Sequence, residues 1–212
     1  MLASIRGTSA TVTQPSGWIT IVNLGNVKVF ARYAAVAGSQ VYPVAFSGGA
    51  AGDDTIAQIA LFRNTDINPS GSPATLSNAS QQNLPWPAAS PTVAGTIGVV
   101  LGWKQDDWSS SPVPSYPWDG GLGDTAVTAG NDAGQVWWQR TKTTTAVQAA
   151  GSWTVTGGGA AVSKSAMFFL APKPFTNQET TTITPSLQDS TGAEYIWIKN
   201  LTRPYANTPI TT

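Results

Sequence analysis

The sequence predicts an all-β protein, built from tandem antiparallel β-sandwich or jelly-roll units and ending in an extended C-terminal arm. The prediction rests on short runs of alternating or β-branched residues, on glycine and proline between these runs, and on a repeat. Residues 41–62 and 152–171 each contain an apolar run, a glycine-containing hinge and a second apolar run. A repeated pattern constrains the architecture before any functional motif does.

The first predicted unit covers residues 1–66. Val27 and Val29 alternate with Lys28 and Phe30, and this period of two is typical of a strand. Pro43 lacks a backbone donor, which favours an edge position for its strand. The strands predicted in this unit are 9–13, 17–22, 27–36, 40–46 and 56–63.

The second predicted unit covers residues 91–172, and a connector rich in Asn, Ser, Pro and Gln, residues 67–90, precedes it. Residues 91–104 form the most apolar segment, which predicts a central strand. Residues 105–123 contain aromatic side chains between breaks at Pro and Gly, and we expect a long loop that is ordered by its aromatic residues. Further strands are predicted at 135–140 and on both sides of the second hinge.

Residues 173–212 differ in composition from the rest of the chain. They are rich in Thr, contain scattered prolines, and include one predicted strand, 194–200. A segment of this kind buries too little apolar surface to fold alone. We therefore expect an extended arm that becomes ordered on a neighbouring molecule, and hence a homo-oligomer.

Composition excludes several classes of function. Lys+Arg and Asp+Glu number 11 each, so the net charge is zero, and neither nucleic acid nor a membrane surface is an expected partner. The chain has no His and no Cys, which removes the usual general base, thiolate nucleophiles and thiolate metal sites. We expect no enzyme and no cofactor. Charged residues are only 10% of the chain, which suits a protein that assembles.

The candidate contact residues lie in and beside the predicted loop 105–123. Aromatic rings stack on the C–H faces of sugars, and carboxylates accept hydrogen bonds from hydroxyl groups, so this pattern suits a host-surface glycan. The alternatives are a hydrophobic lid over an open sandwich end or a contact with a neighbouring subunit, and we favour these. The residues are Trp103, Asp106, Asp107, Trp108, Tyr116, Trp118 and Asp119.

The acidic residues do not predict a catalytic or metal site. The pairs Asp53-Asp54 and Asp106-Asp107 are adjacent in sequence, and adjacent residues of a strand point to opposite faces, unlike the facing carboxylates of glycosidases. The second glycine hinge lacks the Lys-Ser/Thr of a phosphate loop. Oxygen ligands for Ca²⁺ are available, but their spacing fits no known calcium loop, so no metal is expected. These ligands are Asp119, Asp124, Asn131 and Asp132.

Short segments of the first unit resemble β-sandwich modules in virion proteins of tailed bacteriophages, of the minor tail, fibre and head-decoration types. These segments are Gly17-Trp18-Ile19-Thr20, Arg32-Tyr33 and Ala57-Gln58-Ile59. The second unit departs from the pattern, with Trp118-Asp119 and Gln139-Arg140 in the corresponding places. The resemblance implies a virion location and no catalytic residues.

From these observations we expect a non-enzymatic structural protein of a phage virion or phage-like particle. It would assemble as an oligomer on the tail or capsid surface, with other virion proteins as partners. The alternative is a carbohydrate-binding module or adhesin that uses the aromatic loop.

Overall fold

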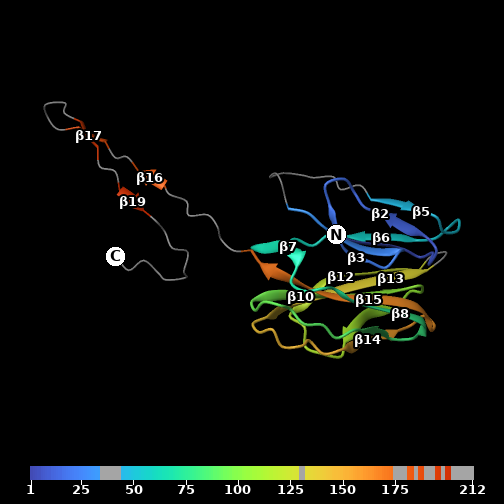
Figure 1. The fold of residues 1–212 in the computed structure, drawn as a ribbon. Helices are drawn as coiled ribbons and strands as arrows, with labels where there is room; N and C mark the ends of the chain where they lie inside the picture. Colours follow the sequence, from blue (N-terminus) through green and yellow to red (C-terminus); the bar gives the residue numbers. More distant parts are fainter. Residues whose placement is uncertain are drawn as a thin grey trace. The chain divides into compact units, whose positions relative to one another are not determined.

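The computed structural model describes residues 1–33, 44–128 and 132–173, together with the backbone of four short strands beyond them (Figure 1). The chain divides into two compact units, Met1–Pro172 and Lys173–Thr212. The regular elements of the described residues are β-strands, and their pairings are antiparallel, so the all-β prediction is confirmed. Within the same residues, no helix has the length and apolar character needed to cross a membrane.

The first sheet of unit Met1–Pro172 has the strand order β3-β4-β1-β6. A separate pair, β2 and β5, packs on its outer face through a cluster that includes Met1, Val12 and Phe30. The bounds are β1 Leu2–Ile5, β2 Thr11–Thr13, β3 Ile19–Asn23, β4 Val27–Ala31, β5 Ala45–Ser47 and β6 Thr55–Gln58.

The central sheet has the order β12-β13-β10-β15-β7, and β8 pairs with the same edge of β15 as β7 does. Strand β10 lies between β13 and β15, which confirms the prediction of a central strand within residues 91–104. The bounds are β7 Thr65–Pro69, β8 Ala74–Gln81, β10 Thr96–Lys104, β12 Gly120–Val127, β13 Ala133–Lys142 and β15 Ala161–Pro172.

A third sheet, of order β11-β14-β9, covers the other face of the central sheet. Its strands are β9 Leu84–Trp86, β11 Ser110–Pro114 and β14 Gly151–Thr156. Alternation along β10 gives each face of the central sheet its own apolar core: Val99 and Leu101 pack toward the first sheet, and Val100 packs toward the third. The layers are therefore stacked, with β2 and β5 at one end and β14 at the other (Figure 1).

Buried hydrogen bonds join the first sheet to the central sheet. Ser4 Oγ lies 2.7 Å from Gln135 Oε1, and Gln135 Nε2 donates to Gln58 Oε1 at 2.9 Å. Lys164 Nζ donates to Leu24 O at 2.7 Å, and burial lowers the pKa of this ammonium. Buried polar groups cost free energy unless they are paired, so these contacts fix one arrangement of the two sheets.

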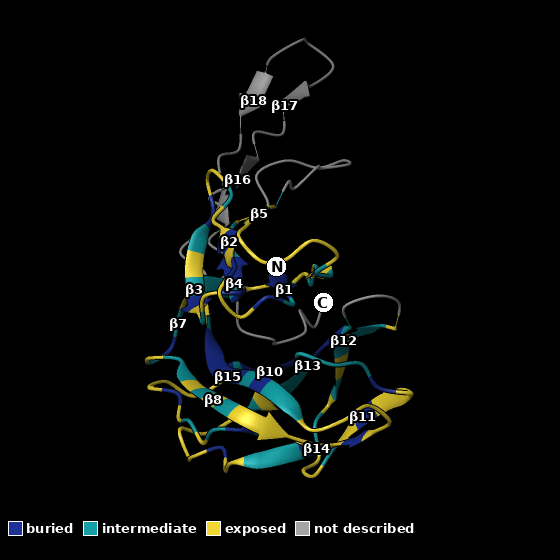
Figure 2. Ribbon diagram, turned by 90° about the vertical axis from the view of Figure 1, so that its right-hand side faces the viewer, coloured by how far each residue is buried: buried dark blue, intermediate teal, exposed yellow. Residues whose placement is uncertain are grey.

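Two segments predicted as irregular contain strands instead. The connector 67–90 includes β8 and β9, and the loop 105–123 includes β11 and the start of β12. Strand β8 is a sheet edge with most of its residues exposed or half-buried, so polar residues suffice there and no apolar pattern marks it (Figure 2). In unit Lys173–Thr212 the single predicted strand is replaced by four: β16 Thr181–Ile183, β17 Ser186–Gln188, β18 Glu194–Ile196 and β19 Lys199–Leu201.

The strands predicted in the first unit are shorter than expected. Strand 27–36 ends at Ala31 in the structure, and strand 56–63 ends at Gln58. Most of the predicted strand 40–46 lies outside the described residues, which resume at Val44. Residues Ile59 to Phe62 leave the first sheet and lead into β7 of the central sheet, which ends their pairing.

The two repeated glycine hinges connect strands that belong to different sheets. The first takes the chain from β5 to β6, and the second takes it from β14 to β15, so each carries the chain from one sheet to another. Gly48 and Gly49 have φ angles of 72° and 91°, and Gly157 and Gly158 have 82° and 66°. Glycine adopts this region without strain, which explains its repetition at both crossings.

Candidate functional site

The structure buries the tryptophans that the sequence suggests for binding. Trp103 is fully buried between the first and central sheets, and Trp108 is 5% exposed under the third sheet. Trp108 Nε1 donates a hydrogen bond to Asp124 Oδ1 at 2.9 Å. Neither ring presents a face on which a sugar could stack.

The remaining aromatic candidates lie at the margin of the same core. Trp118 is half-buried and packs edge-on against Trp86, with ring centroids 5.9 Å apart. Tyr116 is 39% exposed, and the guanidinium carbon of Arg140 lies 4.8 Å from its ring centroid. Arg140 lowers the pKa of the Tyr116 hydroxyl through a hydrogen bond and its charge. Of the predicted aromatic set, only Tyr116 is substantially exposed.

The carboxylates of this region are engaged by the backbone. Asp106 Oδ1 accepts the Asp107 N–H at 3.0 Å, and its Oδ2 accepts the Gly159 N–H of the second hinge. Asp119 Oδ2 accepts the Thr141 N–H at 2.6 Å. Both side chains therefore fix local backbone, and neither is positioned over an open cleft as a general acid or base would be.

Three carboxylates nevertheless come together. One oxygen each of Asp106, Asp107 and Asp132 lies within 4.8 Å of the others. The buried ammonium of Lys104 lies 3.8 Å from Asp106 Oδ2, where it supplies positive charge to the cluster. Burial lowers the pKa of Lys104, and the charges of Asp106 and Asp107 oppose this effect.

Of the calcium ligands considered from the sequence, only Asp132 belongs to this cluster. Asp124 and Asp119 are engaged elsewhere, as described above. Asn131 lies outside the described residues. The cluster was not expected from the sequence, because Asp132 is brought to Asp106 by the pairing of β10 with β13.

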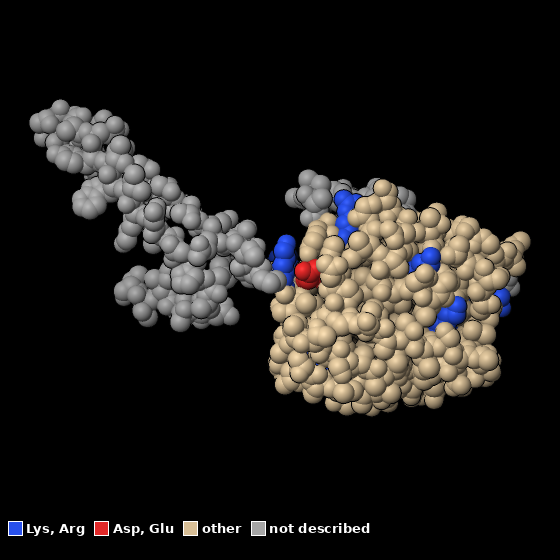
Figure 3. Space-filling model, viewed as in Figure 1, with Lys and Arg blue, Asp and Glu red and all other residues tan. Residues whose placement is uncertain are grey.

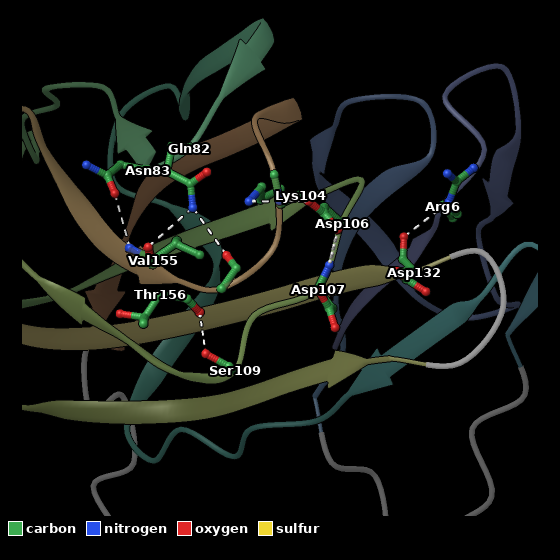
Figure 4. A network of polar contacts seen from close by, with 12 residues as sticks. Arg6, Gln82, Asn83, Lys104, Asp106, Asp107, Ser109, Asp132, Val155 and Thr156 are labelled. Atoms are coloured by element: carbon green, nitrogen blue, oxygen red, sulfur yellow. Dashed lines mark hydrogen bonds and ion pairs between the residues drawn. The ribbon is translucent and has the colours of Figure 1, made fainter.

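Polar side chains around this cluster hold the second hinge from several directions (Figure 4). Gln82 Nε2 donates to Gly157 O at 3.2 Å, and Asn83 Oδ1 accepts the Val155 N–H at 3.2 Å. Ser109 Oγ donates to Thr156 O at 3.0 Å. On the other side of the cluster, Arg6 Nε donates to Asp132 O at 3.1 Å. These contacts favour a structural role, because they immobilise the turn at which the chain changes sheet.

An apolar pocket lies between the first and central sheets. It has a volume of about 140 Å³ and an apolar lining contributed by the first and central sheets. Its rim exposes Ile59 by 47%, Leu61 by 85% and Tyr33 by 43%. Tyr33 Oη donates to Asp66 Oδ1 at 3.2 Å across the rim.

Sequence reasoning missed this pocket. The signal is present in the run Ile59-Ala60-Leu61-Phe62, which is apolar at every position. A strand buried on one face alternates instead. A continuous apolar run indicates a segment buried on both faces, or one that lacks a partner on one of them.

Comparison of the chain with protein-family models, with curated proteins and with solved structures gives no significant match. The resemblance to phage virion modules therefore stays a prediction from short segments. The argument for function depends on the geometry of the chain itself.

Proposed function

We propose that this chain is a non-enzymatic structural protein of a phage virion or phage-like particle, assembling as an oligomer on the tail or capsid surface. One observation carries the proposal: the apolar pocket with its exposed rim of Tyr33, Ile59 and Leu61. Contiguous exposed apolar surface on a folded protein marks a site where another surface binds.

The surface of the described chain carries few charges. On the face shown in Figure 3, charged side chains are few and most of the surface is uncharged. Removing such a surface from water costs little, because few charges need to be desolvated. The zero net charge of the chain also leaves little repulsion between copies.

The finer architecture belongs to the same proposal. Residues 1–172 would form two stacked sandwich or jelly-roll units, and residues 173–212 would act as an extended arm. Strands β16 and β19 pair with each other, as do β17 and β18, which makes two ribbons of two strands each. Two-stranded ribbons are at best marginally stable in water, so an arm of this kind gains stability from a surface on which it can lie.

Binding of a host-surface glycan is the weaker alternative. It needs exposed rings next to acceptor groups, and Trp103 and Trp108 are buried, whereas Tyr116 is paired with Arg140. Titration of the intrinsic tryptophan fluorescence with glycans from candidate hosts tests it. A saturable change that Tyr116→Ala abolishes would revive this alternative.

Sedimentation velocity of the full chain and of residues 1–172 tests the assembly. We expect the full chain to sediment as an oligomer and the shortened chain as a monomer with unchanged far-ultraviolet circular dichroism. A full chain that stays monomeric at high concentration contradicts the proposal. If the chain is an oligomer, gold-labelled antibodies against residues 1–172 locate the protein on the head or the tail of purified particles.

A further inference from the structure

Strand β8 is an edge of the central sheet, and its outer side is open. Its inner side pairs with β15 in unbroken register from Ala74 to Asn78. Among the described residues, no other strand pairs with β8. Thr75 and Ser77 are exposed, and Figure 2 shows the strand at the surface in teal and yellow. An edge strand presents a row of unpaired N–H and C=O groups, which is a template for pairing with another strand.

Strand β8 lacks the features that keep an edge from pairing. Proteins protect edge strands with charged side chains, with proline, with bulges or by keeping the strand short. Strand β8 is eight residues long and contains neither a charged residue nor proline. Its one irregularity in pairing lies beyond Asn78, so a regular stretch of five residues remains.

The other free edges of the described sheets each carry at least one of these features. Strands β3 and β12 contain a break in register. Strands β7, β9 and β11 contain proline. Strands β2, β5, β6 and those of unit Lys173–Thr212 are only three or four residues long. The contrast singles out β8 as the edge that is suited to pairing.

We propose that β8 pairs antiparallel with β8 of a second copy of this chain and so joins two central sheets edge to edge. The inference deepens the proposed function and rests on it, because it names a contact between copies that assembly brings together. Addition of a strand to a sheet edge supplies main-chain hydrogen bonds, and these need no particular side chain.

A second β8 fits this edge for reasons of charge and composition. In a twofold contact the same residues face each other from both copies. Because β8 has no charged residue, no register of the two strands places like charges opposite each other. The exposed hydroxyl groups of Thr75 and Ser77 add favourable cross-strand pairs. The zero net charge of the chain leaves little repulsion between the copies.

The contact is small, and this is why it depends on assembly. Strand β8 offers eight residues, whereas a stable interface takes about 20–30 residues a side. Copies held together elsewhere reach an effective concentration on the order of millimolar, at which a weak contact forms. We therefore expect β8 to pair in the oligomer of the full chain and not in residues 1–172 alone.

Disulfide cross-linking tests the pairing directly, because the chain has no cysteine of its own. Thr75→Cys, Ser77→Cys and Ala79→Cys each place a thiol at an exposed position of β8. The variants of the full chain are oxidised alone and mixed in pairs, so that each register of the exposed positions is sampled. Directly opposite residues of paired strands have Cβ atoms about 4.5–5.5 Å apart, which is near the separation in a disulfide. Val113→Cys is the control, because Val113 is 65% exposed on the proline-containing edge β11.

We expect at least one β8 variant or pair to form a disulfide between two chains at least tenfold faster than Val113→Cys does. Adding Ser77→Lys to the fastest of the variants that keep Ser77 should slow the reaction at least tenfold, because it brings like charges into the contact. Thr154→Lys is its control, since Thr154 is exposed on β14, the middle strand of the third sheet. Rates equal to that of Val113→Cys in all β8 variants and pairs overturn the proposal.

Sedimentation velocity of the same samples separates this inference from the proposed function. An oligomeric chain whose β8 variants react no faster than the control refutes the edge pairing and leaves assembly standing. A monomeric chain with the same slow rates counts against assembly as well. Equally fast cross-linking in residues 1–172 and in the full chain overturns the dependence of the pairing on assembly.

Discussion

The central sheet has two covers, and they differ in how completely they close. The third sheet seals its face: Trp86 and Trp153 are buried, with ring centroids 4.6 Å apart, and Trp108 lies beside them. The first sheet leaves a pocket with Ile59 and Leu61 exposed at its rim. The difference shows that richness in aromatic residues does not locate a binding surface. In this chain the aromatic cover is closed, and the exposed apolar side chains lie at the rim of the pocket between the first and central sheets.

Glycines make the aromatic cover possible. A Cβ atom on Gly102 would come within 2.9 Å of Trp153, and one on Gly151 would come as close as 2.5 Å to Trp86. A Cβ atom on Gly134 would clash with the six-membered ring of Trp108. The rings lie flat against strands that have no side chain at these points, which gives the close packing on which core stability depends.

Trp153→Ala should be the most damaging single change on the closed side. The ring is fully buried, and its removal leaves a large cavity, so we expect the free energy of unfolding to fall by about 3–5 kcal/mol. Urea unfolding followed by circular dichroism measures the loss. Trp118→Ala is the comparison, since that ring is only half-buried, and its loss should be smaller. Equal losses of stability would mean that the buried ring of Trp153 contributes no more to the core under the third sheet than the half-buried ring of Trp118 does.

Gly134→Ala should act through overpacking. The added methyl group meets the Trp108 ring, and we expect a loss of about 1–3 kcal/mol. Gly120→Ala is the control, because a Cβ atom there meets nothing within 4 Å and the residue lies on β12 of the same sheet. Thermal unfolding of the two variants should give a lower midpoint for Gly134→Ala alone. A similar midpoint for both would show that Trp108 can move away at little cost.

The Met1 amino group, which lies in the lining of the apolar pocket, gives a prediction about the pH dependence of stability. Burial lowers the pKa of the Met1 amino group from 8.0 to about 5. Between these values the unfolded chain binds a proton that the folded chain does not. Stability should therefore rise with pH from 5 to 8, with a slope approaching about 1.4 kcal/mol per pH unit. The chain has no His or Cys, so this amino group is the one with an ordinary pKa in that window.

Urea unfolding at several pH values, in a preparation with a free amino group on Met1, measures the slope. Acetylation of the Met1 amino group is the control, and it should abolish the slope of stability against pH. An acetylated chain with the same slope would show that another group titrates there.

The sequence predicted the β class and the central strand because these depend on local pattern. Residues 91–104 form the most apolar segment of the sequence, and strand β10 within it is buried on both faces. Strands β8 and β11 could not be predicted in the same way, since they are polar edge strands whose existence depends on pairing with β15 and β14. Tertiary pairing overrides weak local preference in such segments.

The candidate contact residues show the same limit. The run from Trp103 to Asp119 has the composition of a sugar-binding loop, yet whether a ring is exposed depends on what packs against it. Gly134 and Gly151, far along the chain, make the room in which Trp108 and Trp86 are buried. The apolar pocket was equally hidden, because its lining comes from segments of the first and central sheets that are far apart in the sequence.

Sedimentation velocity of two charge variants of the full chain compares the two covers most directly. Leu61→Asp and Val113→Asp each place a carboxylate at a highly exposed apolar position, and each should change the free energy of unfolding by less than about 0.5 kcal/mol. We predict that Leu61→Asp sediments as a monomer, because a charge at the rim of the apolar pocket must be desolvated on assembly. Val113→Asp should remain an oligomer like the unchanged protein. The same oligomeric state for both variants would contradict the proposal that the apolar pocket between the first and central sheets is the assembly surface.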